Sequence, residues 1–97
     1  MGFFQDKRIL VTGASGFVGT NLLRRLLAEG ARCRAVTHTR DLRVTDDRVE
    51  HRRGDLTDPR FCAQVVAGVD YVFHCAASTS GAAVIARTPL VHVTPNV

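Results

Sequence analysis

The feature that most constrains this chain is a glycine-rich turn between an apolar segment and an amphipathic segment. Residues 8–11 form an apolar run, and the turn that follows contains Gly13, Gly16 and Gly19. Residues 17–29 then carry leucines at helical spacing. This pattern predicts a buried strand, a tight turn and a helix, in that order. The free amides of the helix start would then face one point beyond the strand, which suits a phosphate group.

Each glycine has a distinct expected role. Gly13 permits the sharp exit from the strand, Gly16 lets a pyrophosphate approach the backbone, and Gly19 lets the helix pack close to the sheet. Glycines at this spacing also occur in turns without a ligand, but the strand before and the helix after favour a dinucleotide. A Walker-type loop is excluded, because Val18-Gly19-Thr20 stands where Gly-Lys-Ser/Thr is needed.

The rest of the chain alternates between strand and helix patterns. We expect further strands at 33–37, 49–53 and 71–76, the second of these at an edge of the sheet. Asp58 as N-cap and Pro59 at the first helical position begin a helix before the last strand. This order predicts an α/β fold of Rossmann type, with helices on both faces of the sheet as three layers. Its parallel sheet of about four strands, in the order 3-2-1-4, is an incomplete half of a doubly wound domain.

Beyond Gly81 the pattern is less regular. Residues 82–86 are compatible with a helical turn, and Thr88-Pro89 with the start of a helix toward the end of the chain. Pro95 would lie inside that helix, where it removes a hydrogen bond and clashes with the preceding turn. We therefore expect a short, broken or disordered segment there.

Composition and charge narrow the classes of function. The 97 residues permit one small domain, and 45% hydrophobic with 23% charged residues are typical of a globular chain. The net charge is +4, but acids at 41, 46, 47, 50 and 55 interrupt the arginine-rich middle. Because no continuous basic face results, we expect no nucleic-acid partner. No apolar run reaches membrane-spanning length, so we expect no membrane partner either.

The cysteines and histidines follow no metal-ligand spacing. Cys33, Cys62 and Cys75 are odd in number and widely separated, which argues against a disulfide framework or a zinc site. Cys75 ends an apolar run and is expected to be a buried thiol. The first residues lack the apolar length of a signal peptide. We therefore expect a reducing, cytoplasmic location and no bound metal.

The end of the second predicted strand bears on the choice between two nicotinamide cofactors. An NAD site places an acid there for the ribose 2′-hydroxyl, whereas an NADP site places a cation near the 2′-phosphate. Here His38, Thr39 and Arg40 follow the strand, and the first acid is Asp41. We therefore favour NADP over NAD, with Arg40 as the first candidate for the phosphate and His38 as the second. The alternative is that Arg40 is a solvated loop residue and Asp41 reaches the ribose.

Four segments of the chain resemble the extended short-chain dehydrogenases/reductases, the NAD(P)-dependent epimerase/dehydratase family. The stretch Thr12-Gly13-Ala14-Ser15-Gly16-Phe17-Val18-Gly19 is similar to the family's cofactor loop. The other three are Gly54-Asp55-Leu56-Thr57-Asp58, His74-Cys75-Ala76-Ala77, and Thr88-Pro89 with Asn96-Val97. They follow the family's order and together span nearly the whole chain.

The resemblance implies a role in cofactor binding for particular residues. Asp55 would accept a hydrogen bond from the adenine amino group beside the Leu56 backbone; the alternative is a turn residue that bonds its own backbone. His74 is expected to be structural. The expected cofactor-binding residues are Gly13, Ser15, Gly16, Phe17, Val18, Gly19, His38, Arg40, Asp55, Leu56, Ala76, Ala77 and Ser78.

The resemblance also implies what these residues lack. Catalysis in the family uses a Ser or Thr with a Tyr-x-x-x-Lys pair, in which the lysine lowers the tyrosine pKa. The chain's one tyrosine, Tyr71, and one lysine, Lys7, cannot form this pair. We therefore expect residues 1–97 to be the N-terminal part of an NAD(P)-binding domain, without catalytic or substrate segments and without turnover of their own.

Three possibilities remain open at this point. The first is the cofactor half of a nucleotide-sugar epimerase, dehydratase or reductase, whose longer parent binds the sugar nucleotide and could be a homodimer. Segments 37–41 and 78–89 are loosely similar to GDP-fucose synthase-type reductases, which favours this substrate class. The second is a non-enzymatic dinucleotide-binding or redox-sensing module. A non-functional truncated product, with an unpaired edge at its fourth strand, is the third option.

Overall fold

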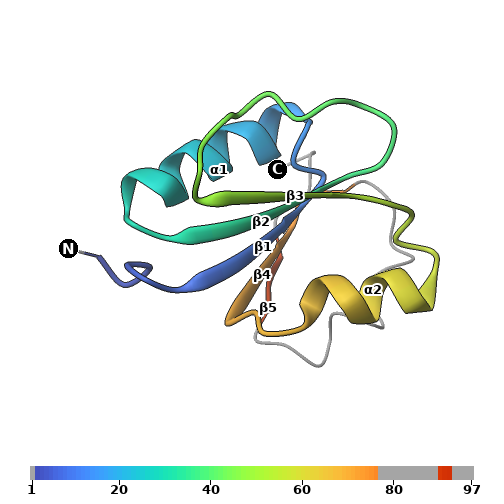
Figure 1. The fold of residues 1–97 in the computed structure, drawn as a ribbon. Coiled ribbons are helices and arrows are strands. Elements are labelled where there is room, and N and C mark those ends of the chain that lie inside the picture. Colours follow the sequence, from blue (N-terminus) through green and yellow to red (C-terminus); the bar gives the residue numbers. More distant parts are fainter. Residues whose placement is uncertain (1, 77–89, 93–97) are drawn as a thin grey trace.

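In the part of the chain that the structure describes, a parallel sheet lies between helix α1 on one face and helix α2 on the other (Figure 1). The computed structural model describes residues 2–76 and 90–92. Within them the strand order is β3-β2-β1-β4-β5, all neighbours parallel. The elements are β1 (Arg8–Thr12), α1 (Phe17–Ala28), β2 (Arg32–Thr37), β3 (Val49–Arg53), α2 (Pro59–Val66), β4 (Tyr71–His74) and β5 (Leu90–His92). The predicted Rossmann-type order 3-2-1-4 and the edge position of β3 are confirmed.

The fifth strand corrects the expectation for the end of the chain. We expected a helix from Thr88 or an irregular segment, but β5 lies parallel to β4, with Leu90 opposite Val72 and His92 opposite His74. The outer edge of β4 carries backbone amides and carbonyls, and β5 pairs with this edge. The expected unpaired edge at the fourth strand is therefore also wrong. The helical turn expected at 82–86 lies outside the described residues.

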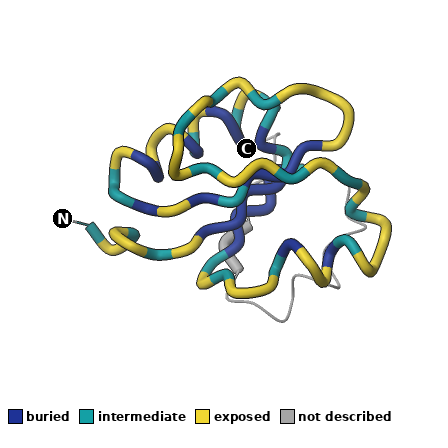
Figure 2. Tube along the Cα trace, in the orientation of Figure 1, coloured by how far each residue is buried: buried dark blue, intermediate teal, exposed yellow. Residues whose placement is uncertain are grey.

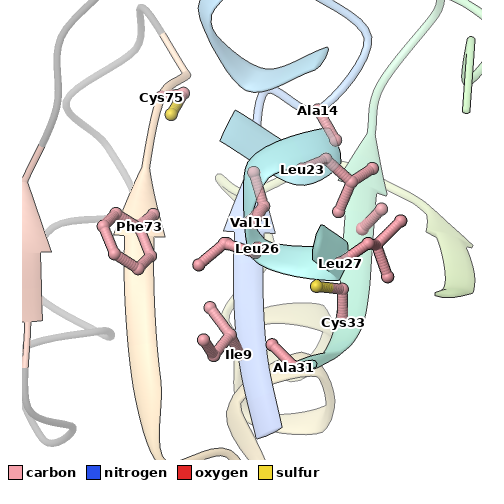
Figure 3. Close-up of a cluster of buried hydrophobic side chains, with 11 residues drawn as sticks. Ile9, Val11, Ala14, Leu23, Leu26, Leu27, Ala31, Cys33, Phe73 and Cys75 are labelled. Atoms are coloured by element: carbon pink, nitrogen blue, oxygen red, sulfur yellow. The ribbon is translucent and has the colours of Figure 1, made fainter. Parts of the chain in front are cut away.

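The larger core cluster lies between α1 and the sheet (Figure 3). α1 buries Leu23, Leu26 and Leu27 against Ile9 and Val11 of β1, as the spacing of the leucines predicts. Figure 2 shows the buried residues concentrated along the central strands. The helix ends before Gly30, whose φ of 85° closes the turn into β2.

The smaller core cluster lies on the opposite face, under α2. Leu10, Val36, Val65 and Val72 are buried there. Asp58 accepts the Arg60 amide at 2.9 Å, and Pro59 occupies the first helical position; the predicted helix start is thus confirmed. Among the described helices, none is long and apolar enough to cross a membrane.

Several arginines of the central region bond the carboxyl ends of the helices. The Arg34 guanidinium donates to the carbonyl oxygens of Val65 at 2.7 Å and Ala67 at 2.9 Å, at the end of α2. It also pairs with Glu50 at 3.1 Å. Arg48 donates in the same way to Leu27, in the last turn of α1, at 2.9 Å. Cations at these positions complement the carbonyls and the negative end of each helix dipole.

We expect Arg34→Ala to lower the free energy of unfolding by about 2 kcal/mol, because carbonyls at the end of α2 lose a charged donor. Arg25→Ala is the matched control, since the Arg25 side chain is 76% exposed and forms an exposed ion pair with Glu29 in α1 at 3.6 Å. That variant should change the free energy of unfolding by no more than about 0.5 kcal/mol. Urea denaturation of both variants measures the difference, and equal losses would contradict the capping role of Arg34.

Candidate functional site

The glycine turn lies at the carboxyl ends of β1 and β4, where the strand order reverses direction. In open parallel sheets this is the place where ligands bind. A cavity of about 420 Å³ opens there. It is lined by residues that follow or end β1, β2, β3 and β4, namely Gly13, Val36, Thr37, His38, Gly54, Asp55, Leu56, Thr57 and Ala76.

The backbone conformation and packing of the turn require glycine at two of its positions. Gly13 has a φ of 64°, and a Cβ there would lie 2.7 Å from the Ala76 nitrogen. A Cβ on Gly19 would overlap the Gly13 carbonyl oxygen and lie 2.8 Å from the Cα of Ala14. The turn therefore brings the strand exit, the start of α1 and the end of β4 into direct backbone contact.

Gly16 is different, because nothing in the described chain requires a glycine there. Its φ of −77° and ψ of 175° are extended backbone that any residue adopts. A Cβ on Gly16 would meet only the Gly13 carbonyl oxygen, at 3.4 Å. Gly16 is also the N-cap of α1, a position where Ser, Thr, Asp or Asn would cap the helix better. Open space at an uncapped helix start is what a ligand that approaches the backbone needs.

The backbone amides at the start of α1 also indicate a ligand site. No side chain caps the helix, and the first turn contains no acidic residue. Within the described part of the chain, the amides of Phe17 and Val18 have no hydrogen-bond acceptor. Unbonded amides at a helix N-terminus attract anions through both hydrogen bonds and the helix dipole. The residues present therefore fit a diphosphate, which is the central group of a dinucleotide.

Asp55 lines the cavity while also shaping its own turn. Its Oδ1 accepts the Thr57 amide at 2.8 Å, and its carbonyl accepts the Asp58 amide at 3.0 Å. This is the turn role that we gave as the alternative for Asp55. The bonds from the Thr57 amide and from the Thr57 side chain, with a smaller contribution from the charge of His38, hold the pKa of the Asp55 carboxyl below its ordinary value. The Asp55 carboxylate therefore serves its own turn while it lines the cavity.

The charged residues after β2 are separated in space. His38 lines the cavity, whereas Arg40 is exposed and does not. Asp41 pairs with Arg53 at 2.6 Å, and both line a second cavity of about 610 Å³ that His38 does not line. The carboxylate of Asp41 is therefore engaged by the guanidinium of Arg53. In the described residues Arg40 forms no ion pair.

The structure brings most of the expected cofactor-binding residues to this corner of the sheet. Ala77 and Ser78 lie outside the described residues, and Arg40 lies apart from the cavity. The cavity lining is formed in part by Gly13, His38, Asp55, Leu56 and Ala76, and the adjoining turn and helix start by Ser15, Gly16, Phe17, Val18 and Gly19.

Val36, Thr37, Gly54 and Thr57 also line the cavity but were not among the expected binding residues, although Gly54 and Thr57 lie in one of the segments that resemble the family. Their positions at or just after the carboxyl ends of β2 and β3 were the signal that could have found them. Gly54 is also required sterically, because a Cβ there would overlap the ring of Phe61.

The other groups that could carry chemistry, His74 and the three cysteines, are buried in the fold. His74 is buried and its Nδ1 lies 2.7 Å from the Thr12 hydroxyl, consistent with the structural role that we expected. The three cysteines are free and buried, and burial raises the pKa of Cys33 and of Cys75 to about 11. No group of three potential metal ligands occurs in the part of the chain that the structure describes.

The strand order, the crossover helices and the glycine turn at the switch point define a Rossmann-type α/β fold. The model of the NAD dependent epimerase/dehydratase family matches residues 9–97. The chain belongs to this family.

Relatives of known activity are similar to about three quarters of the chain. The chain is 43% identical over 70 residues to a 3 beta-hydroxysteroid dehydrogenase/Delta 5-->4-isomerase of Mycobacterium tuberculosis, covering 72% of this chain and 19% of that protein. It is 39% identical over 77 residues to GDP-mannose 3,5-epimerase 1 of Oryza sativa subsp. japonica, covering 76% and 20%. A short chain dehydrogenase from Leptospira borgpetersenii with bound NAD+ superposes with a TM-score of 0.68 at 26% identity, covering 77% and 33%.

The chain therefore spans about a fifth of the length of the curated relatives it matches.

Proposed function

We propose that residues 1–97 form the cofactor-binding part of an NAD(P)-dependent member of this family, and that they bind NADP in preference to NAD. The observation that carries the proposal is the open space at Gly16 beside the unbonded amides of Phe17 and Val18. The Leptospira relative with bound NAD+ supports the class of ligand. When bound, such a cofactor supplies hydride chemistry at its nicotinamide ring.

The positions around the cavity suit the parts of a dinucleotide. The diphosphate would bind the unbonded amides of Phe17 and Val18, close to Ser15, Gly16 and Gly19. The adenine would lie against Leu56, with its amino group donating to the carboxylate of Asp55. Ala76 would lie beside the nicotinamide half, and we extend that role to Ala77 and Ser78 on the family resemblance alone.

The NADP preference depends on the residues that follow β2. His38 lines the cavity next to the position proposed for the ribose, and Arg40 follows two residues later. The acid that could repel a 2′-phosphate, Asp41, is paired with Arg53. A charge-assisted bond from Arg40 or His38 to the phosphate would contribute about 1.5–3 kcal/mol.

We expect the full chain to bind NADPH about 10-fold to 100-fold more tightly than NADH, which is the free energy of one charge-assisted bond. Titration calorimetry with both cofactors measures this ratio. The fragments 2′,5′-ADP and 5′-ADP form a matched pair that differs in the 2′-phosphate alone. Tighter binding of NADH would overturn the NADP preference, and failure of both cofactors to bind would overturn the proposed function.

For a longer protein that contains this chain, we propose a nucleotide-sugar substrate and a cytoplasmic location. The similarity to GDP-mannose 3,5-epimerase 1 supports this substrate class. The steroid dehydrogenase relative makes a hydroxysteroid the second candidate. Assaying the longer protein with one substrate of each class, in the presence of NADP, separates the two.

The alternative function, a non-enzymatic dinucleotide module, predicts the same binding without turnover by any longer form. Thiol-based redox sensing has little support among the described residues, because sensor thiols need a low pKa and exposure. All three thiols here are buried, and burial raises the pKa of each.

A further inference from the structure

Arg53, at the end of the edge strand β3, contacts the loop at 38–41. This loop carries His38 and Arg40, the residues proposed to favour NADP over NAD. We propose that Arg53 is a positioning residue for this choice: it holds the carboxylate of Asp41 away from the cavity in which His38 lies. This inference rests on the proposed function and adds to it a residue that does not itself line that cavity.

The ends of β2 and β3 are tied together by the backbone. Arg53 is in register with Thr37, the last residue of β2, and the Gly54 amide donates to the Thr37 carbonyl oxygen at 3.0 Å. The backbone of Arg53 is thereby fixed next to the start of the loop at 38–41. Its guanidinium then reaches the loop from a defined place on the sheet.

Two hydrogen bonds from Arg53 hold the loop on either side of Arg40. Nη2 bonds Asp41 Oδ1 at 2.6 Å, and Nη1 donates to the Thr39 carbonyl oxygen at 3.3 Å. Arg40 lies between these two anchored residues and has no ion-pair partner in the described chain. Among the described residues, Arg40 is therefore a cation of this loop without an ion pair, while the acid Asp41 is paired with Arg53.

The location of the pair matters more than its strength. The side chain of Asp41 is 95% exposed and that of Arg53 46% exposed, so the ion pair adds little to the stability of the fold. However, Asp41 and Arg53 line the second cavity together with His51, whereas His38 lines the first. The pair therefore separates the carboxylate from the position proposed for the ribose.

Loss of Arg53 would change the electrostatics that a cofactor meets. An unpaired Asp41, on a loop no longer anchored at Thr39, can turn toward the ribose. There a carboxylate accepts a hydrogen bond from the 2′-hydroxyl of NADH and repels the 2′-phosphate of NADPH. The ratio of the two dissociation constants should therefore move toward NADH.

The test is a cycle of variants in the full chain, with Kd for NADPH and NADH measured for each. We expect Arg53→Ala to lower the preference for NADPH by about 5-fold, which corresponds to about 1 kcal/mol for an exposed charge pair. Asp41→Asn should not lower it, and Arg53→Ala combined with Asp41→Asn should return it to within about 2-fold of the native ratio. Arg53→Lys, which keeps the charge, should retain most of the preference.

Arg52→Ala is the matched control, because Arg52 is the neighbouring arginine of β3 and contacts Glu50 and Gln64 rather than the loop. It should leave the ratio unchanged. If Arg53→Ala does not fold, Arg53→Gln removes the same charge and keeps a donor for Thr39.

Each outcome separates the inference from the function on which it rests. An unchanged ratio in Arg53→Ala and Arg53→Gln overturns the role of Arg53 and leaves NADP binding intact. A double variant that shifts as far as Arg53→Ala alone also overturns it, because Arg53 then acts without Asp41. A native chain that prefers NADH, but whose ratio still moves in Arg53→Ala and returns in the double variant, supports Arg53 and overturns the NADP preference. No binding of either cofactor overturns both.

Discussion

Gly13→Ala should lower the free energy of unfolding by at least about 3 kcal/mol. The left-handed backbone at Gly13, with φ of 64°, alone costs an alanine about 1–2 kcal/mol. The added Cβ would also lie 2.7 Å from the Ala76 nitrogen and from the Cys75 carbonyl carbon. Both atoms belong to the backbone after β4, so relieving the contact means shifting the sheet.

Gly68→Ala provides the control for this prediction. Gly68 has a φ of 75°, so an alanine there meets the same conformational cost. Its Cβ would meet only the Nη1 atom of the flexible Arg8 side chain, at 3.6 Å. We expect a loss of about 1–2 kcal/mol in Gly68→Ala. Urea denaturation of the two variants isolates the steric part, and equal losses would contradict a close approach of the turn to β4.

The elements that the sequence predicts well are those set by local signals. The apolar run at 8–11, the leucine stripe of α1 and the start of α2 at Asp58-Pro59 each occur within a residue or two of the observed bounds. Strand order follows from these elements because right-handed crossovers leave few topologies open. The weakly apolar segment at 49–53 could be placed at the edge, because a central strand needs apolar residues on both faces.

The features that sequence reasoning did not find depend on partners far apart in the chain. β5 is short, and its sequence alone does not indicate that it pairs with β4 as a strand. The Arg34 cap of α2 joins residues more than thirty positions apart. Likewise, the sequence offers Asp41 as an open alternative for the ribose, and only the contact with Arg53 across the sheet edge shows that its carboxylate is engaged.

The candidate site shows the same division between local and distant causes. The glycine roles could be assigned from spacing, since each depends on a turn a few residues long. Part of the cavity lining could not be assigned in this way, because Val36 and Thr37 reach the cavity through the register of β2 with β3.

Gly16→Ser should weaken dinucleotide binding by about 30-fold or more while the fold stays as stable as the native chain. Serine is a good N-cap, so the free energy of unfolding should stay the same or rise by a few tenths of a kcal/mol. Its Cβ would meet only the Gly13 carbonyl oxygen at 3.4 Å, and Gly16 has an extended backbone that serine adopts without strain. Binding should nevertheless fall, because the side chain occupies the open space and its hydroxyl bonds a helix amide that the diphosphate would use. A 30-fold increase in Kd corresponds to a loss of about 2 kcal/mol of binding free energy.

The two measurements together distinguish a ligand site from a structural turn. If the glycine turn serves only the fold, then Gly16→Ser should behave like any compatible substitution and leave Kd for NADPH unchanged. If an anion binds the amides of Phe17 and Val18, stability and affinity must separate in this one variant, since the residue that improves the cap obstructs the ligand. Gly68→Ala serves again as the control, because Gly68 follows α2 and does not line the cavity; it should lose stability and keep the native Kd. Gly16→Ser should thus keep its stability and lose affinity, whereas Gly68→Ala should keep its affinity and lose stability. A purely structural turn does not produce this opposite behaviour.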